Sequence, residues 1–234
     1  DNPLGNPIVD FYSISEEALS FDNGVCIDRF NYPNPYSGIL YLRTDRVYGR
    51  YRGDVTVVSD AGDASYLTVE GNLTIQSDIF IRTTVTVKKN VYVESGTVSI
   101  EGELRAEDVI FCDGSDSALK MEQAVSAIKC TNFYYGSNRS SEKLSNGEID
   151  VTGDFYVKDT GTPDSFVCSG EHKVVTSGSE GIQKVTVENK ESCLEILYVS
   201  NGNGGMTRAT EGTLSILSGI SPIRIYGKEL KGIL

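Results

Sequence analysis

The stretch VEGNLTI (69–75) decides the fold, because the chain repeats it closely at four other places. The other copies are YRGDVTV (51–57), VKKNVYV (87–93), IEGELRA (100–106) and VTGDFYV (151–157). The first three copies follow at intervals of 18 residues, and the next comes 13 residues later. Internal repeats at short intervals are typical of solenoids, in which each repeat contacts only its neighbours.

Each copy reads as a bend followed by a short strand. An apolar or aromatic residue, a variable residue and usually Gly precede Asn, Asp or Glu. The last three letters then alternate between inward and outward types with a period of two, as in a half-buried strand. The Gly-Asn step suits a turn because both residue types tolerate positive φ. We therefore expect each copy to build one coil, with Gly and Asn at its corner.

Alternating or β-branched segments also fill the intervals between the copies and the part of the chain after them, which indicates an all-β protein. The sequence predicts a parallel β-solenoid (β-helix) over residues 51–234. Residues 1–50 are less regular and rich in Pro, Asn and Tyr, so we expect them to form an N-terminal cap. A β-sandwich also has many short alternating strands and is the alternative fold.

Two segments have helix-like features. SISEEALSF (13–21) offers a serine cap followed by two glutamates in the first turn. SALKMEQAVSAI (117–128) has helix-forming letters, but its short apolar runs fit two strands equally well. The second segment therefore stays open between helix and strand.

The charge balance bears on the partners. The formal net charge is −12, whereas binding to a nucleic-acid backbone or an anionic membrane depends on clustered Lys and Arg. No apolar run approaches the ~20 residues that span a bilayer. We expect no nucleic-acid partner and no membrane insertion; the partner is unknown, with a glycan or a surface protein as the possibilities.

The second half of the chain resembles a known kind of repeat. Four pieces follow in order: Leu119–Met121, Gly147–Phe155, Gly170–Gly178 and Gln183–Val187. In this order they resemble a β-repeat region of large uncharacterised secreted or cell-surface proteins of Gram-positive bacteria, clostridia and their relatives. The resemblance implies an extracellular or cell-surface location in a bacterium. It implies no activity and no catalytic residues.

The usual catalytic groups are sparse. His172 is the only histidine, and it lies at the start of a strand-like run, which favours a structural role. The five cysteines contain no CxxC, and we expect buried thiols more than disulfides. Three carboxylate pairs lie near turn residues and could serve a glycosidase only at a suitable separation. They are Asp60 with Asp63, Asp113 with Asp116, and Glu148 with Asp150.

Calcium is a weak cofactor candidate. DAGDAS (60–65) and DGSDS (113–117) each place two carboxylates among small residues, which suits a hard cation with oxygen ligands. The candidate ligands are Asp60, Asp63, Asp113 and Asp116. Neither loop completes an EF-hand, so turn capping is the simpler interpretation, and we expect no cofactor otherwise.

The segment 30–54 concentrates Tyr and Arg, the residue types that recognition surfaces favour. The candidate binding residues are Tyr32, Tyr36, Tyr41, Tyr48, Tyr51, Arg46 and Arg50. The alternative is that these side chains pack the cap onto the first coil.

We expect a non-catalytic module that acts as a rigid spacer or adhesin-type binding scaffold. A carbohydrate-binding module would instead show a line of exposed Tyr along one face. A polysaccharide lyase or hydrolase would show two carboxylates facing each other across a groove.

Overall fold

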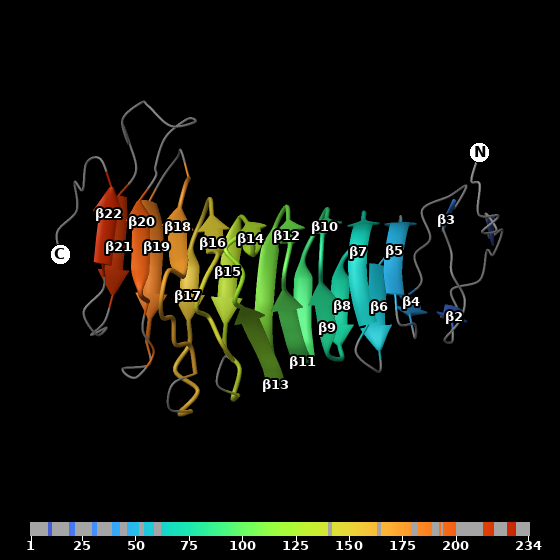
Figure 1. Cartoon of the computed structure of the whole chain (residues 1–234), viewed down its shortest axis with the longest axis horizontal. Coiled ribbons are helices and arrows are strands. Elements are labelled where there is room, and N and C mark those ends of the chain that lie inside the picture. Colours follow the sequence, from blue (N-terminus) through green and yellow to red (C-terminus); the bar gives the residue numbers. More distant parts are fainter. Residues whose placement is uncertain are drawn as a thin grey trace.

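The chain folds as a parallel β-solenoid in a computed structural model (Figure 1). The structure describes residues 62–139, 142–162, 165–178, 182–188, 192 and 194–199, together with strand segments between 9 and 58 and between 213 and 227. In this part every regular element is a strand, and every strand pairing is parallel. The predicted solenoid is confirmed, and the β-sandwich alternative is wrong because a sandwich pairs its strands antiparallel.

The strands stack into three ladders that run along the long axis. Ladder A contains β2 (Leu19–Phe21), β4 (Ile39–Leu42), β6 (Asp54–Val58), β8 (Leu73–Gln76), the first half of β11 (Val91–Ile100), the first half of β13 (Val109–Met121), β15 (Asn132–Tyr135), β17 (Phe155–Val157), β19 (Ile182–Val187) and β21 (Thr213–Leu217). Ladder B contains the first parts of β5 (Arg46–Tyr51) and β7 (Gly62–Val69), then β9 (Ile79–Ile81), the second halves of β11 and β13, and single bridges at Leu144 and Cys168.

Ladder C completes each coil. It contains the last parts of β5 and β7, then β10 (Thr84–Val87), β12 (Glu103–Ala106), β14 (Ala127–Cys130), β16 (Glu148–Val151), β18 (Lys173–Thr176), β20 (Ile196–Val199) and β22 (Arg224–Gly227). The chain passes from ladder A to B to C and then enters the next coil. Two further strands, β1 (Val9–Asp10) and β3 (Phe30–Asn31), form a separate parallel pair.

The two helix-like segments have different outcomes. Residues 117–121 belong to β13 and residues 127–130 to β14, with a turn between them, so the strand alternative for 117–128 is correct. In 13–21 the last three residues form β2, and residues 13–18 lie outside the described part. No described helix has the length and apolar character that crossing a membrane requires.

Parallel pairing also occurs upstream of residue 51. β2 pairs with β4, and β4 pairs with β6, in the same ladder as the later coils. The remainder of the proposed cap, 1–50, lies largely outside the described residues, so the boundary at 51 stays a prediction.

The core is a set of columns of inward-facing side chains. In ladder C, five directly paired residues are fully buried: Val85, Leu104, Ile128, Ile149 and Val174. Each such side chain contributes about 1.5–3 kcal/mol through burial. Because the columns share one continuous interior, each coil depends on its neighbours for that burial.

The Asn and Asp of the repeat form a second column at one corner. The amide N of Asn72 donates to Asp54 Oδ1 at 2.7 Å, and that of Asn90 donates to Asn72 Oδ1 at 3.2 Å. The bond partners are 18 residues apart in both cases, which is the length of one coil. The same bond recurs from Asp154 to Asn132 Oδ1 at 2.7 Å. The predicted corner position of Asn is therefore confirmed, but its reason is different. Asn72 and Asn90 have no positive φ, and their side chains form hydrogen bonds between coils.

The glycines of the repeat are required for a different reason from the positive φ that we expected. Positive φ occurs at other described glycines, and Gly102 and Gly153 do not share it. A Cβ at Gly102 would lie 2.1 Å from the carbonyl oxygen of Thr83, and a Cβ at Gly153 would lie 2.4 Å from Asn132 Oδ1. Glycine stands there because the previous coil approaches too closely for a side chain.

The five copies do not build five equivalent coils. The copies at 51–57, 69–75, 87–93 and 151–157 end in ladder A, whereas the copy at 100–106 ends in ladder C, in the same coil as 87–93. The expectation of one coil per copy is wrong for this copy. Its interval of 13 residues is a step between two ladders of one coil.

Candidate functional site

The Tyr and Arg residues predicted as a binding surface fall on the N-terminal strands or outside the described part. Tyr41 lies in β4, and Tyr48, Tyr51, Arg46 and Arg50 lie in β5. Their side chains are not among those described, and Tyr32 and Tyr36 lie outside the described residues altogether. The recognition surface predicted there stays a prediction.

The predicted calcium ligands are separated into two places. Asp63 forms an ion pair with Arg82 Nε at 2.9 Å, while Asp60, the other candidate ligand of that loop, lies outside the described residues. Asp116 has an exposed side chain that lies 3.8 Å from an Arg139 nitrogen, and Asp113 is exposed nearby in β13. Among the described residues, no three His, Cys, Asp or Glu side chains gather as a metal site would need. The calcium hypothesis gains no further ligand from these contacts.

The third carboxylate pair lies on the outer side of β16. Glu148 forms an ion pair with Lys173 at 3.0 Å, and Asp150 accepts a hydrogen bond from Ser177 Oγ at 2.5 Å. Both carboxylates project from one strand, two residues apart, so they stand beside each other on one surface. They do not face each other across a gap as an acid and a nucleophile would.

His172 lies inside the solenoid. Its side chain is fully buried, and neither ring nitrogen has a hydrogen-bond partner. Burial lowers the pKa of His172 from 6.5 to about 4, because the charged imidazolium would lose its hydration. The structural role expected for this residue agrees with its position, since a buried ring does not reach a substrate.

Three buried cysteines are thiols that form no disulfide: Cys112, Cys130 and Cys168. Burial raises the pKa of Cys112 to about 12 and also raises that of Cys130. Such thiols are inert because the thiolate is the reactive form. The prediction of buried thiols is confirmed for these three, while Cys26 and Cys193 lie outside the described residues.

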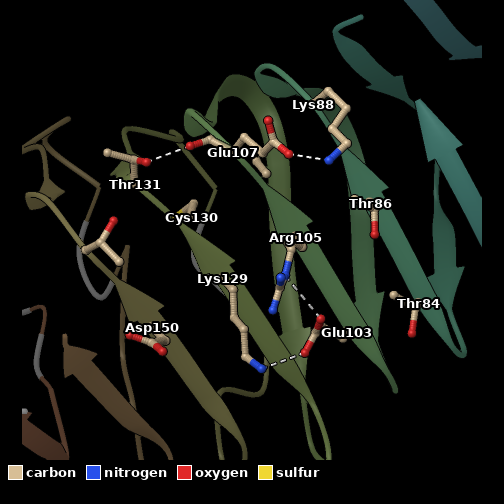
Figure 2. A pocket seen from close by; sticks show the side chains of 12 residues that line it. Thr84, Thr86, Lys88, Glu103, Arg105, Glu107, Lys129, Cys130, Thr131 and Asp150 are labelled. Atoms are coloured by element: carbon tan, nitrogen blue, oxygen red, sulfur yellow. Dashed lines mark hydrogen bonds and ion pairs between the residues drawn. The ribbon is translucent and has the colours of Figure 1, made fainter. Parts of the chain in front are cut away.

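The outer face of ladder C carries a groove of about 610 Å³ (Figure 2). It runs across β10, β12, β14 and β16, and therefore along the solenoid axis. One side is a row of four residues in register: Thr86, Arg105, Lys129 and Asp150. The other side is a rim just beyond the strand ends, formed by Lys88, Glu107, Thr131 and Thr152.

Ion pairs hold both sides of the groove in place. On the rim, Lys88 pairs with Glu107, and Thr131 Oγ1 donates to the Glu107 carbonyl oxygen at 2.6 Å. On the other side, the Glu103 carboxylate forms ion pairs with Lys129 Nζ at 2.7 Å and with Arg105 Nε at 3.5 Å. Figure 2 shows Arg105 and Lys129 leaning towards Glu103 and away from the rim.

The groove exists because the residues between its two sides point inward. Ala106 and Cys130 line the floor, and both side chains are buried in the core. Along a strand, successive side chains alternate between the two faces, so the residue after Arg105 or Lys129 leaves only backbone on the surface. The floor is thus backbone, and the walls are charged and hydroxyl side chains.

Ladder A carries a column of half-buried aromatic rings on its outer face. Tyr92 and Phe111 stack with centroids 5.3 Å apart and planes 3° apart. Phe111 and Tyr134 follow at 5.9 Å, and Tyr134 and Tyr156 at 5.3 Å and 11°. The rings of the closely parallel pairs cover one another's faces, so the column presents ring edges outward and offers no broad platform for a flat ligand.

The column ends at Tyr156, which interacts with Glu188. A hydrogen bond to the Glu188 carboxylate raises the pKa of Tyr156 to about 12, since the bond needs the phenolic proton. The column contains three tyrosines and one phenylalanine, all half-buried, whereas a carbohydrate-binding module would show a line of exposed Tyr. Because the rings stack on one another, the main role of the column is to stabilise ladder A.

Sequence reasoning missed both surface features, although one signal was present. The sixth letter of each repeat copy points outward, and it is Tyr92 and Tyr156 in two ladder A copies and Arg105 in the ladder C copy. Aligning the copies on that letter would have marked two rings of the aromatic column, because Phe111 and Tyr134 lie outside the copies. The groove needed the assignment of 100–106 to ladder C as well.

No family model matches the chain, and neither the curated proteins nor the solved structures contain a match.

Proposed function

We propose that this chain is a non-catalytic module of a bacterial secreted or surface protein, and that it acts as a rigid, adhesin-type scaffold. The observation that carries the proposal is the unbroken parallel stacking. Ladder A continues without interruption from β2 to β21, and ladder C from β5 to β22. A stack of this kind keeps its two ends apart at a fixed distance and displays a long surface.

The placement of the candidate catalytic groups supports a non-catalytic role. His172 is buried in the core, and Glu148 and Asp150 stand side by side on one strand, where they contact Lys173 and Ser177. Neither arrangement provides a proton donor opposite a nucleophile. The extracellular setting rests on the sequence resemblance alone.

The experiment that tests the scaffold role changes the number of coils. Residues 55–72 and 73–90 are two complete coils of 18 residues at the Asn corner. Inserting both segments twice adds four coils and should lengthen the particle by about 20 Å, because neighbouring strands lie ~4.8 Å apart. Small-angle X-ray scattering measures the length and the cross-section, and the cross-section should not change.

Two results would overturn the proposal. An insertion variant whose cross-section grows in place of its length would show that the chain does not behave as a rigid rod. Release of new reducing ends or unsaturated sugars from a panel of polysaccharides incubated with the unmodified chain would show catalysis.

A further inference from the structure

We propose that the groove on ladder C binds a neutral, extended glycan chain that lies along the solenoid axis. This inference rests on the proposed scaffold function and names the ligand that the scaffold would hold.

The shape of the groove favours a polymer. Its wall residues come from four successive strands in register, so polar groups recur at each strand spacing of ~4.8 Å. A compact ligand would use one strand and leave the others empty. A linear chain of sugar rings offers polar groups that also recur along one direction, and it can contact every strand.

The chemistry of the walls favours hydroxyl groups. Arg105 uses Nε in its 3.5 Å ion pair with Glu103, and its other two nitrogens carry further N–H donors in a planar fork. Thr86 and Thr152 add hydroxyls that both donate and accept. Asp150 supplies acceptor oxygens on the same wall. Alternating donors and acceptors match the paired hydroxyls of a sugar, each of which donates one bond and accepts others.

The charge balance favours a neutral chain. The groove contains three cations and three carboxylates: Lys88, Arg105 and Lys129 with Glu103, Glu107 and Asp150. These charges cancel locally, while the whole chain carries −12. A polyanion would gain no net attraction in the groove and would be repelled by the rest of the molecule. A neutral glycan meets neither difficulty.

The arrangement of the walls also lowers the cost of binding. Arg105 and Lys129 are fixed by a shared carboxylate, and Arg105 still has half of its side chain exposed (51%). Side chains that are already ordered lose little conformational entropy when a ligand arrives. Binding therefore keeps more of its hydrogen-bond energy than it would on flexible surface lysines.

The experiment is a glycan-array screen of the full chain with linear neutral oligosaccharides and with uronate-bearing ones. Any hit is then titrated by calorimetry against three variants. Arg105→Ala removes the donors, and Thr86→Trp fills the groove and leaves every ion pair intact. Arg82→Ala is the matched control, because Arg82 also forms ion pairs, with Asp63 and Glu101, but none of these three residues lines the groove. Circular dichroism confirms that each variant is folded.

We expect a neutral glycan to bind, with an affinity that rises with chain length until the groove is filled. Arg105→Ala should weaken binding about 10- to 100-fold, since a hydrogen bond to a charged group contributes ~1.5–3 kcal/mol. Thr86→Trp should abolish binding, and Arg82→Ala should leave it unchanged.

Three outcomes overturn the proposal. They are a blank array, binding only to uronate-bearing glycans, and binding that survives both Arg105→Ala and Thr86→Trp. None of them affects the length measurement on the insertion variant, so failure of the groove and failure of the scaffold are told apart.

Discussion

Asn72 joins its own coil to both neighbours through one side chain. Its Nδ2 donates to Asp54 Oδ1 at 3.3 Å, and its Oδ1 accepts the backbone N–H of Asn90 at 3.2 Å. A side-chain amide carries a donor NH₂ and an acceptor oxygen on opposite sides, so it can donate to one neighbouring coil and accept from the other. This explains why the repeat places Asn at positions 72 and 90. Asp54 and Asp154 occupy the same corner, and their carboxylates accept the backbone N–H of Asn72 and Lys184.

Asn72→Ala should lower the free energy of unfolding by about 1–3 kcal/mol, because the backbone N–H of Asn90 loses its acceptor. Urea denaturation of the full chain measures the change. Asn138→Ala is the control, since the Asn138 side chain is exposed, and we expect a change below ~0.5 kcal/mol there. Equal effects of the two substitutions would show that the corner bonds contribute little.

His172 should make the stability depend on pH. Its pKa is about 4 in the folded chain and about 6.5 in the unfolded chain, so between these pH values the unfolded chain binds the extra proton. The contribution of neutral His172 to the free energy of unfolding is fully present above pH 6.5. It falls as the pH drops towards 4, by up to about 3 kcal/mol. Denaturation midpoints at a series of pH values measure this.

His172→Leu removes the titrating group and should flatten the part of that slope between pH 6.5 and 5, where carboxylates still contribute little. An unchanged slope in the variant would place the acid sensitivity at other groups. The missing hydrogen-bond partners of both ring nitrogens also predict that Leu costs little stability at neutral pH.

The aromatic column shows how an element gains stability from its outer face. Phe111 lies between Tyr92 and Tyr134 and contacts both rings. Each aromatic pair contributes ~0.5–1.5 kcal/mol beyond the burial of its area. The column therefore joins β11, β13 and β15 independently of the core.

Phe111→Ala should destabilise the chain by about 2–3 kcal/mol, from two ring contacts and part of the buried ring area. Thermal or urea unfolding measures it. Tyr66→Ala is the comparison, because Tyr66 has 75% of its area exposed, and we expect less than ~0.5 kcal/mol from its loss. If both substitutions cost the same, the column has no stabilising role.

The strands themselves were largely predictable, because inward alternation and the Gly-Asn step are local signals that a sequence carries directly. The ladder to which a strand belongs was not. Arg105 and Tyr92 occupy the same letter of the repeat, yet one lies in the groove and the other in the aromatic column. They differ only in the ladder that their strands join, and this depends on how many residues the chain uses to complete one coil. That number changes from 18 residues at Asn72 to 30 at Lys184.

At the scale of the whole molecule, each coil contacts only the coils on either side. Unfolding a central coil breaks its interfaces with two neighbouring coils, whereas unfolding a terminal coil breaks only one interface. β11 and β13 share the longest described pairing, with nine residue pairs and one register shift between Val93 and Ser95. They should form the most protected part of the stack.

Hydrogen exchange followed by mass spectrometry should find the slowest amides in β11–β13 and faster exchange in β18 and β20. Core columns of similar composition in both regions make position along the stack the main difference. Uniform exchange rates across these strands would indicate one cooperative unit and contradict the nearest-neighbour picture.

The direction of the ladder hydrogen bonds has a mechanical consequence. They point from coil to coil, so a pull along the axis loads all the bonds of one interface together and the successive interfaces in series. The weakest interface yields first and releases one coil. An 18-residue coil then extends to roughly 60 Å, at about 3.3–3.6 Å per residue, where it had occupied about 4.8 Å of the stack. Under tension such a rod lengthens in steps, and the longer coils that follow Asp154 release the most slack.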